Sequence, residues 1–125
     1  MDITPLISAD RQVIQGYGPG TFRVSGKSFN SAVIVFPDRV IPWGFHGDIA
    51  ALSPHDFRTV LADDAGIDVV LLGCGKTMAF VPPALRQALK GNGIALEPMD
   101  SGAACRTYNV LMAEGRRVAA ALLPV

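Results

Sequence analysis

This sequence has few cysteines, no long apolar run and no excess of either charge. Only two of its 125 residues are cysteines, Cys74 and Cys105, which argues against a fold held together by disulfides. Hydrophobic residues make up 50% of the chain, enough to build a core without such staples. We therefore expect both thiols to be reduced and the protein to be cytoplasmic.

Neither a membrane span nor a secretion signal is visible. No stretch approaches the roughly 20 apolar residues that cross a bilayer, and the aliphatic runs at residues 69–74 and 118–125 fit buried strands instead. The first residues lack the basic and then apolar prefix of a secretion signal. We expect residues 1–10 to form a loosely ordered leader and residues 11–125 to form a single domain.

The charge balance argues against nucleic acid as a partner. The chain has 11 basic and 11 acidic residues, and its formal net charge is zero. Duplex-binding proteins usually carry a basic stripe, whereas the basic residues here are scattered. The only adjacent pair, Arg116-Arg117, is expected to be solvated surface.

The first half of the chain predicts short strands. Apolar and β-branched runs alternate with turn residues such as Gly18-Pro19-Gly20 and Pro37-Asp38. The strands expected from this pattern cover residues 12–17, 21–24, 31–36 and 39–43. We expect the last two to pair as a hairpin.

The second half predicts helices that alternate with strands. Ser53-Pro54 suits a helix start, and Gly66 suits its end. A second helix is expected to open at Pro82-Pro83 and to end at residues 91–93. The residues expected to face inward are Phe57, Val60 and Leu61 in the first helix, and Leu85, Ala88 and Leu89 in the second. Strands are expected over residues 67–73, 94–99 and 118–125.

The last predicted helix covers about residues 102–114. Asp100 and Ser101 are both good N-caps, and Gly115 suits the helix end. Tyr108 and Leu111 lie on the apolar face of this helix and are expected in the core.

Alternating strands and helices imply a mostly parallel sheet covered on both faces. The near-continuous aliphatic run at residues 67–73 is typical of a central strand buried on both faces. The predicted fold class is therefore α/β, with a single domain. It has a mixed β-sheet flanked by helices in three layers and an additional β-rich N-terminal layer.

Four segments carry a family resemblance. They are Gly16-Tyr17-Gly18, Pro42-Trp43, Gly73-Cys74-Gly75 and residues 99–111. In this order they resemble the Mth938-like domain family, which includes mitochondrial respiratory complex I assembly factor three and stand-alone bacterial and archaeal members. The match runs from about residue 12 to the end of the chain.

The resemblance implies a function but no catalytic residues. It implies a non-enzymatic interaction or assembly factor in the biogenesis of a membrane-bound, complex I-like respiratory complex. Its partners would be respiratory-complex subunits or other assembly factors. The protein would be a monomer or a small homo-oligomer, peripheral to the membrane, and would need no cofactor.

The Gly73-Cys74-Gly75 segment and Lys76 suggest an alternative function. A phosphate-binding loop is excluded because Val70 stands where its first glycine is required. A nest of backbone N–H groups beside Lys76 could still hold an anion, with Arg106 and Asn109 as further candidate ligands. This alternative is a small-molecule or anion-binding protein or enzyme.

Two further groups of residues are candidate sites. His46, His55 and the cysteines lack the spacing of a metal site, so no metal is expected. Trp43 and Phe45 lie in a segment bounded by Gly and Pro. They suit either core packing or an aromatic anchor for a partner, and the sequence leaves both open.

Overall fold

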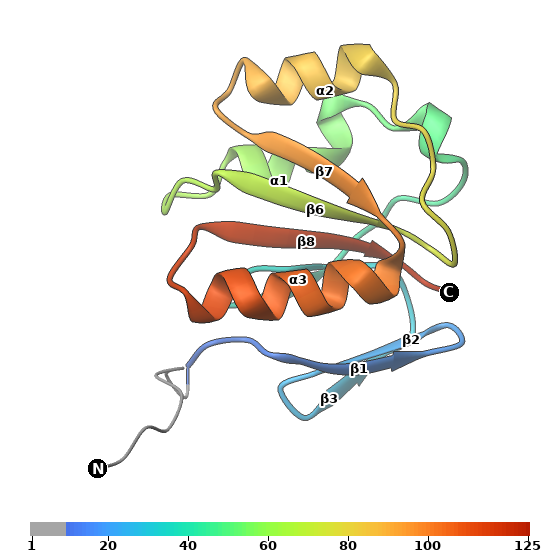
Figure 1. Ribbon diagram of the computed structural model, residues 1–125, viewed down its shortest axis with the longest axis vertical. Helices are drawn as coiled ribbons and strands as arrows, with labels where there is room; N and C mark the ends of the chain where they lie inside the picture. The colour runs from blue at the N-terminus through green and yellow to red at the C-terminus, as the bar shows by residue number, and fades with distance from the viewer. Residues whose placement is uncertain (1–9) are drawn as a thin grey trace.

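A five-stranded mixed sheet forms the centre of the computed structural model, which describes residues 10–125 (Figure 1). Its strand order is β5-β4-β8-β6-β7. The strands are β4 (Val33–Val35), β5 (Val40–Pro42), β6 (Val69–Cys74), β7 (Ala95–Met99) and β8 (Val118–Leu123). β6 pairs in parallel with β7 and β8, and β4 pairs antiparallel with β5 and β8. The hairpin and the buried interior strand predicted from the sequence are confirmed.

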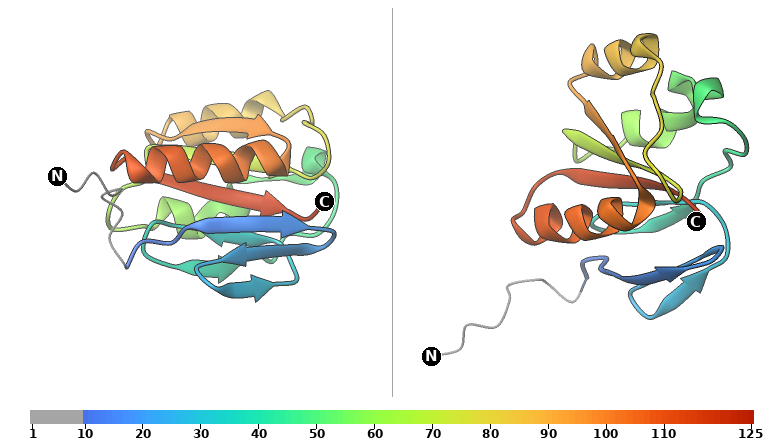
Figure 2. Two further views of the ribbon diagram at one scale, coloured as in Figure 1. Left: turned by 60° about the horizontal axis from the view of Figure 1, so that its bottom comes forward. Right: turned by 45° about the vertical axis from the view of Figure 1, so that its right-hand side comes forward.

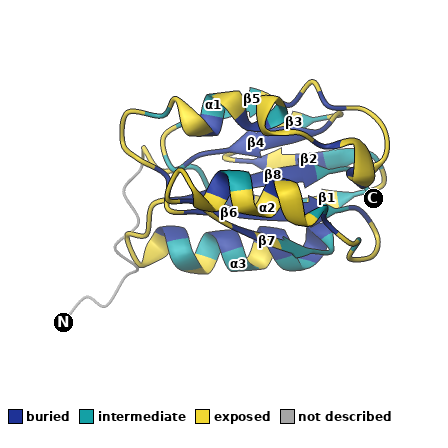
Figure 3. Cartoon of the chain, turned by 90° about the horizontal axis from the view of Figure 1, so that it is seen from above, coloured by how far each residue is buried: buried dark blue, intermediate teal, exposed yellow. Residues whose placement is uncertain are grey.

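The two faces of this sheet are covered by different elements. One face packs against four helical segments: η1 (Ile49–Ala51), η2 (Pro54–Phe57), α1 (Arg58–Leu61) and α2 (Pro83–Lys90). The other face packs against α3 (Ser101–Ala113). Alternate residues of β6 supply the two cores, with Val70 and Leu72 in one and Val69 and Leu71 in the other. Because both faces are covered, β4, β6 and β8 are buried along almost their whole length (Figure 3).

A second sheet, antiparallel and three-stranded, forms the extra N-terminal layer (Figure 2). It consists of β1 (Ile14–Gly18), β2 (Thr21–Val24) and β3 (Lys27–Phe29). Ile14, Phe22 and Val24 are buried in the same core as α3, so this sheet lies beside α3 on one side of the molecule. The predicted fold class, with its additional β layer, is confirmed.

β3 was not predicted from the sequence. It follows a two-residue turn at Ser25-Gly26, where both residues have positive φ angles of 49° and 84°. Such turns match the twist of a hairpin. The Ser-Gly pair was therefore an overlooked signal for a β2–β3 hairpin.

The helix predicted between Ser53 and Gly66 is shorter and less regular than expected. It begins as a 3-10 turn, η2, and only α1 is α-helical. Phe57, with φ −108° and ψ 17°, interrupts the helical geometry between them. Phe57 and Val60 are buried as predicted, but Leu61 is 36% exposed, so its prediction as a core residue was wrong. The interruption leaves a single α-helical turn, too short to hold all three side chains on one face.

The terminal helix resolves the choice between two caps. α3 starts at Ser101 and is capped by Asp100, whose Oδ1 accepts from the Ala103 N–H at 2.8 Å. Tyr108 is fully buried and Leu111 packs at the margin of the core. Of the predicted leader, residues 1–9 lie outside the described residues.

Candidate functional site

The carboxyl end of β6 meets the start of α3 through a buried serine. The Ser101 Oγ accepts from the Gly75 N–H at 2.9 Å and donates to the Leu123 carbonyl at 2.6 Å. Its N–H donates to the Gly75 carbonyl at 2.8 Å. Ser101 therefore joins the ends of β6 and β8 to α3.

Glycine is required where these segments approach each other. A Cβ at Gly73 would lie 2.8 Å from the Ser101 Oγ and 2.9 Å from Leu122 Cδ2, closer than real contacts allow. A Cβ at Gly102 would overlap the Tyr17 hydroxyl. Three of the four segments that carry the family resemblance thus meet at this end of the sheet, and their glycines serve close packing.

The candidate anion ligands are only partly brought together. Gly73, Cys74, Gly75 and Lys76 lie at this strand end, with Lys76 exposed. The Gly75 N–H already has the Ser101 Oγ as its acceptor, so it is not free to form part of a nest. The first-turn N–H groups of Ser101 and Ala103 in α3 are also occupied, by the Gly75 carbonyl and Asp100.

The other two candidate ligands lie further along α3. Arg106 is exposed. The Asn109 side chain is directed at β1 instead: its Oδ1 accepts from the Ile14 N–H at 2.9 Å, and its Nδ2 donates to the Ile14 carbonyl at 2.7 Å. A role of these residues in anion binding stays a prediction.

Trp43 and Phe45 are both buried. They expose 5% and 9% of their surface, respectively. The Trp43 ring centroid lies 5.5 Å from those of Phe45 and Phe57, and its Nε1 donates to the Asp56 carbonyl at 2.9 Å. Core packing and this hydrogen bond account for both aromatic residues.

The two cysteines have different environments, and both are free thiols. Cys105 is buried, and burial raises the pKa of its thiol to about 11, so it is protonated at neutral pH. Cys74 is half-buried and borders an open groove of about 460 Å³, together with Phe45, His46 and Leu123. This groove lies directly beside the end of β6.

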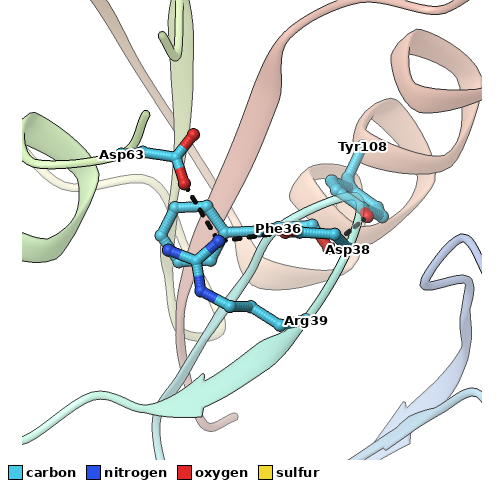
Figure 4. A network of polar contacts seen from close by, with 5 residues as sticks. All are labelled: Phe36, Asp38, Arg39, Asp63 and Tyr108. Carbon is cyan, nitrogen blue, oxygen red and sulfur yellow. Dashed lines mark hydrogen bonds and ion pairs between the residues drawn. The ribbon is translucent and has the colours of Figure 1, made fainter. Parts of the chain in front are cut away.

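A polar network occupies the opposite end of the sheet (Figure 4). The Arg39 Nη1 lies 2.9 Å from both Asp38 and Asp63, and its guanidinium stacks 3.9 Å above the centre of the Phe36 ring. The Tyr108 hydroxyl lies 3.1 Å from the Phe36 carbonyl, and burial raises its pKa well above the ordinary value. Every group in this network has a partner, which fits a structural role.

Within residues 10–125, the most exposed large apolar side chains lie on the loop between β6 and α2. Met78 is 64% exposed and Phe80 is 80% exposed, whereas the neighbouring Val81 is buried and anchors the loop to the core. We call residues 76–81 the apolar loop; Figure 1 draws it at the right-hand side. The sequence motifs did not identify this loop as a candidate site. The sequence did contain a signal for it. Met78 and Phe80 are two large apolar residues between the end of a strand and Pro82-Pro83, where neither a strand nor a helix could bury them.

The described part of the chain has neither a membrane-spanning helix nor a metal-ligating cluster. No helix within residues 10–125 is long and apolar enough to cross a membrane. Over the same residues, no three His, Cys, Asp or Glu side chains are grouped so that they could hold a metal ion.

Comparisons with known proteins agree with the resemblance. An uncharacterised protein of Rhodobacter capsulatus is 40% identical over 90% of this chain and 84% of its own length. NADH dehydrogenase (ubiquinone) 1 alpha subcomplex assembly factor 3 of Danio rerio is 34% identical over 90% of this chain, which spans 64% of that relative.

Solved structures show the same fold. A Bordetella pertussis protein described as a Mth938-like domain superposes with a TM-score of 0.79 and 28% identity, over 99% of this chain and 92% of that one. The family described as "Protein of unknown function (DUF498/DUF598)" matches residues 14–123. The chain therefore belongs to this family, in the Mth938-like fold that its sequence motifs predicted.

Proposed function

We propose that this protein is a non-enzymatic interaction factor in the assembly of a membrane-bound respiratory complex, working at the cytoplasmic face. The relationship to proteins named as complex I assembly factors supports this role. The chain spans only about 60–64% of several of those relatives, so the proposal concerns the domain they share.

The apolar loop carries the proposal. Scattered exposed apolar residues are common on soluble proteins, but Met78 and Phe80 lie two positions apart on one short loop. Burying such a pair against a partner gives each side chain about 1.5–3 kcal/mol of favourable transfer free energy. An assembly factor needs an exposed surface of this kind to recognise an unfinished subunit.

The test is complementation of a deletion strain. Loss of the gene is expected to lower the amount of assembled respiratory complex on native gels while subunit transcripts stay unchanged. The wild-type gene should restore the complex, and a Met78→Ser, Phe80→Ser variant should not, although it melts like the wild type.

Val110→Ser is the matched control. Val110 is 56% exposed on α3, away from the loop, so its variant should restore assembly. Full restoration by the loop variant, or normal assembly in the deletion strain, would contradict the proposal.

A further inference from the structure

One asparagine of this chain is followed by glycine, the pair Asn92-Gly93. Asparagine loses ammonia when the backbone nitrogen of the next residue attacks its side chain. Glycine leaves that nitrogen uncovered because it has no Cβ. The other two asparagines precede Ser31 and Val110, whose side chains hinder the attack. Asn92 is therefore the asparagine at which this spontaneous modification is chemically most favoured.

The pair lies in an open turn directly after α2. Asn92 and Gly93 are both exposed, and Gly93 has a positive φ of 79°. A Cβ built on Gly93 would meet no atom within 4 Å. Water and a ring joining the two residues would therefore find space here, so the surroundings of the turn do not shield it.

Hydrogen bonds instead engage both groups that would react. The Gly93 N–H, whose nitrogen would attack, donates to the Lys90 carbonyl at 2.9 Å. The Asn92 Nδ2, which would leave as ammonia, donates to the Ala88 carbonyl at 3.0 Å. Reaction requires both hydrogen bonds to break, so the closed turn slows it.

The turn is anchored to the core where β7 begins. Ile94 is 3% exposed, and its N–H donates to the Leu89 carbonyl at 3.0 Å. The last turn of a helix nonetheless opens more readily than the rest of a domain unfolds. Such a local opening is sufficient to free both Asn92 and Gly93.

We infer that Asn92 is a modification site at which the last turn of α2 limits the loss of ammonia. When the turn opens, the Gly93 nitrogen gives its proton to hydroxide and bonds to the Asn92 Cγ. The bond from Cγ to Nδ2 breaks, and Nδ2 takes a proton from water and leaves as ammonia. Water then opens the cyclic imide at either carbonyl, which leaves aspartate or isoaspartate in place of Asn92.

The product changes the end of α2 irreversibly. It adds a negative charge beside the carboxyl end of a helix, where the helix dipole disfavours it, and it no longer offers an Nδ2 donor to Ala88. The inference is independent of the proposed function.

Rates of ammonia loss in the folded and unfolded full-length protein test the role of the turn. Both samples are incubated in the same mildly alkaline buffer, one with urea, and peptide mass spectrometry follows the replacement of amide by acid at each asparagine. In urea, Asn92 should react faster than Asn30 and Asn109. In the folded protein its rate should be at least about tenfold lower than in urea, which corresponds to ~1.4 kcal/mol and is the order expected when two hydrogen bonds must break.

A matched pair of glycine substitutions on α2 separates local opening from unfolding of the domain. Ala88→Gly weakens the last turn and should raise the rate at Asn92 in the folded protein about fivefold, the effect of about 1 kcal/mol of lost helix propensity. Ala84→Gly makes the same change in the first turn of α2 and should leave the rate unchanged. Circular dichroism checks that both variants are folded.

Three results would overturn the inference. The first is an equal rate at Asn92 in the folded and the unfolded protein, which would mean that the turn gives no protection. The second is equal acceleration by Ala84→Gly and Ala88→Gly, which would mean that unfolding of more than the last turn is needed. The third is no acceleration by Ala88→Gly.

Discussion

Asn109 acts on β1 as a neighbouring strand would. Its side-chain amide offers one acceptor and one donor to the N–H and the carbonyl of Ile14, so it closes the free edge of the small sheet. Asparagine is a poor helix former, and this pair of hydrogen bonds explains its place in the middle of α3.

We expect Asn109→Leu to lower the free energy of unfolding by about 1–3 kcal/mol, because it leaves both Ile14 groups without their partner. Urea denaturation measures the change. Asn92→Ala serves as the control, since Asn92 makes its hydrogen bond in an exposed position. Equal midpoints for Asn109→Leu and the wild type would show that water replaces the amide at no cost.

Ser101 and Asp100 play different parts at the start of α3. Ser101→Ala removes the buried hydroxyl that joins Gly75 to Leu123, and we expect a loss of about 1–3 kcal/mol. Asp100→Ala removes the cap and should cost about 0.5–2 kcal/mol. Ser101→Thr should be tolerated better than Ser101→Ala if the hydroxyl matters. Thermal melts that rank Ala and Thr at this position in the opposite order would contradict this assignment.

At the scale of elements, β7 is an edge strand of the large sheet, and two features oppose its pairing with a strand of another molecule. The Ala95 N–H donates to the backbone carbonyl of Asp68, on the β6 side. Because backbone groups alternate in direction along a strand, Leu96 and Pro98 direct theirs outward. Pro98 has no N–H to offer, and the Arg86 guanidinium donates to the Leu96 carbonyl at 3.1 and 3.3 Å. These contacts leave little for another strand to pair with.

Removing both features should leave the backbone groups of β7 free to pair with another strand. We expect Arg86→Ala combined with Pro98→Val to form larger species that grow with protein concentration, measured by light scattering. The single variant Lys90→Ala, on the same helix, should behave like the wild type. Identical masses for the double variant and the wild type would show that another feature protects this edge.

The strand end at Gly73-Cys74-Gly75 tests the anion alternative. Because the Gly75 N–H is bound to Ser101, we expect phosphate or sulfate to cause no saturable shift in the amide resonances of residues 73–77 up to millimolar concentration. A saturable shift that Lys76→Ala weakens would instead revive the ligand-binding alternative.

At the scale of the whole molecule, the two sheets differ in how firmly they are held. β6 and β8 are interior strands with partners on both sides, and almost all their residues are buried. β3 is a short edge strand with two of its residues exposed. The small sheet is tied to the rest through α3 and through the Gly20 N–H, which donates to the Val125 carbonyl at 3.1 Å.

Native-state hydrogen exchange should reveal this hierarchy. We expect amides of β6 and β8 to exchange only on global unfolding and those of β3 to exchange first, because local opening follows burial and hydrogen bonding. Protection of β3 equal to that of β8 would mean that the two sheets unfold as one unit.

The sequence by itself determined the features that depend on neighbouring residues. The aliphatic run of β6, the Pro82-Pro83 start of α2 and a helix cap at Asp100 or Ser101 each follow from periodicity or from local backbone chemistry. Together they were sufficient for the α/β fold class. The glycine-containing motifs pointed to the family, since glycine marks positions where backbones approach closely.

Tertiary structure alone decided which surfaces are left uncovered. Trp43 and Phe80 are both aromatic residues near turns, yet one is 5% exposed and the other 80% exposed. Ser101, predicted as one of two possible caps, is a buried link between two strand ends. Burial and exposure depend on segments distant in sequence, so no local pattern distinguishes these cases. The candidate site could therefore be found only after the chain was folded.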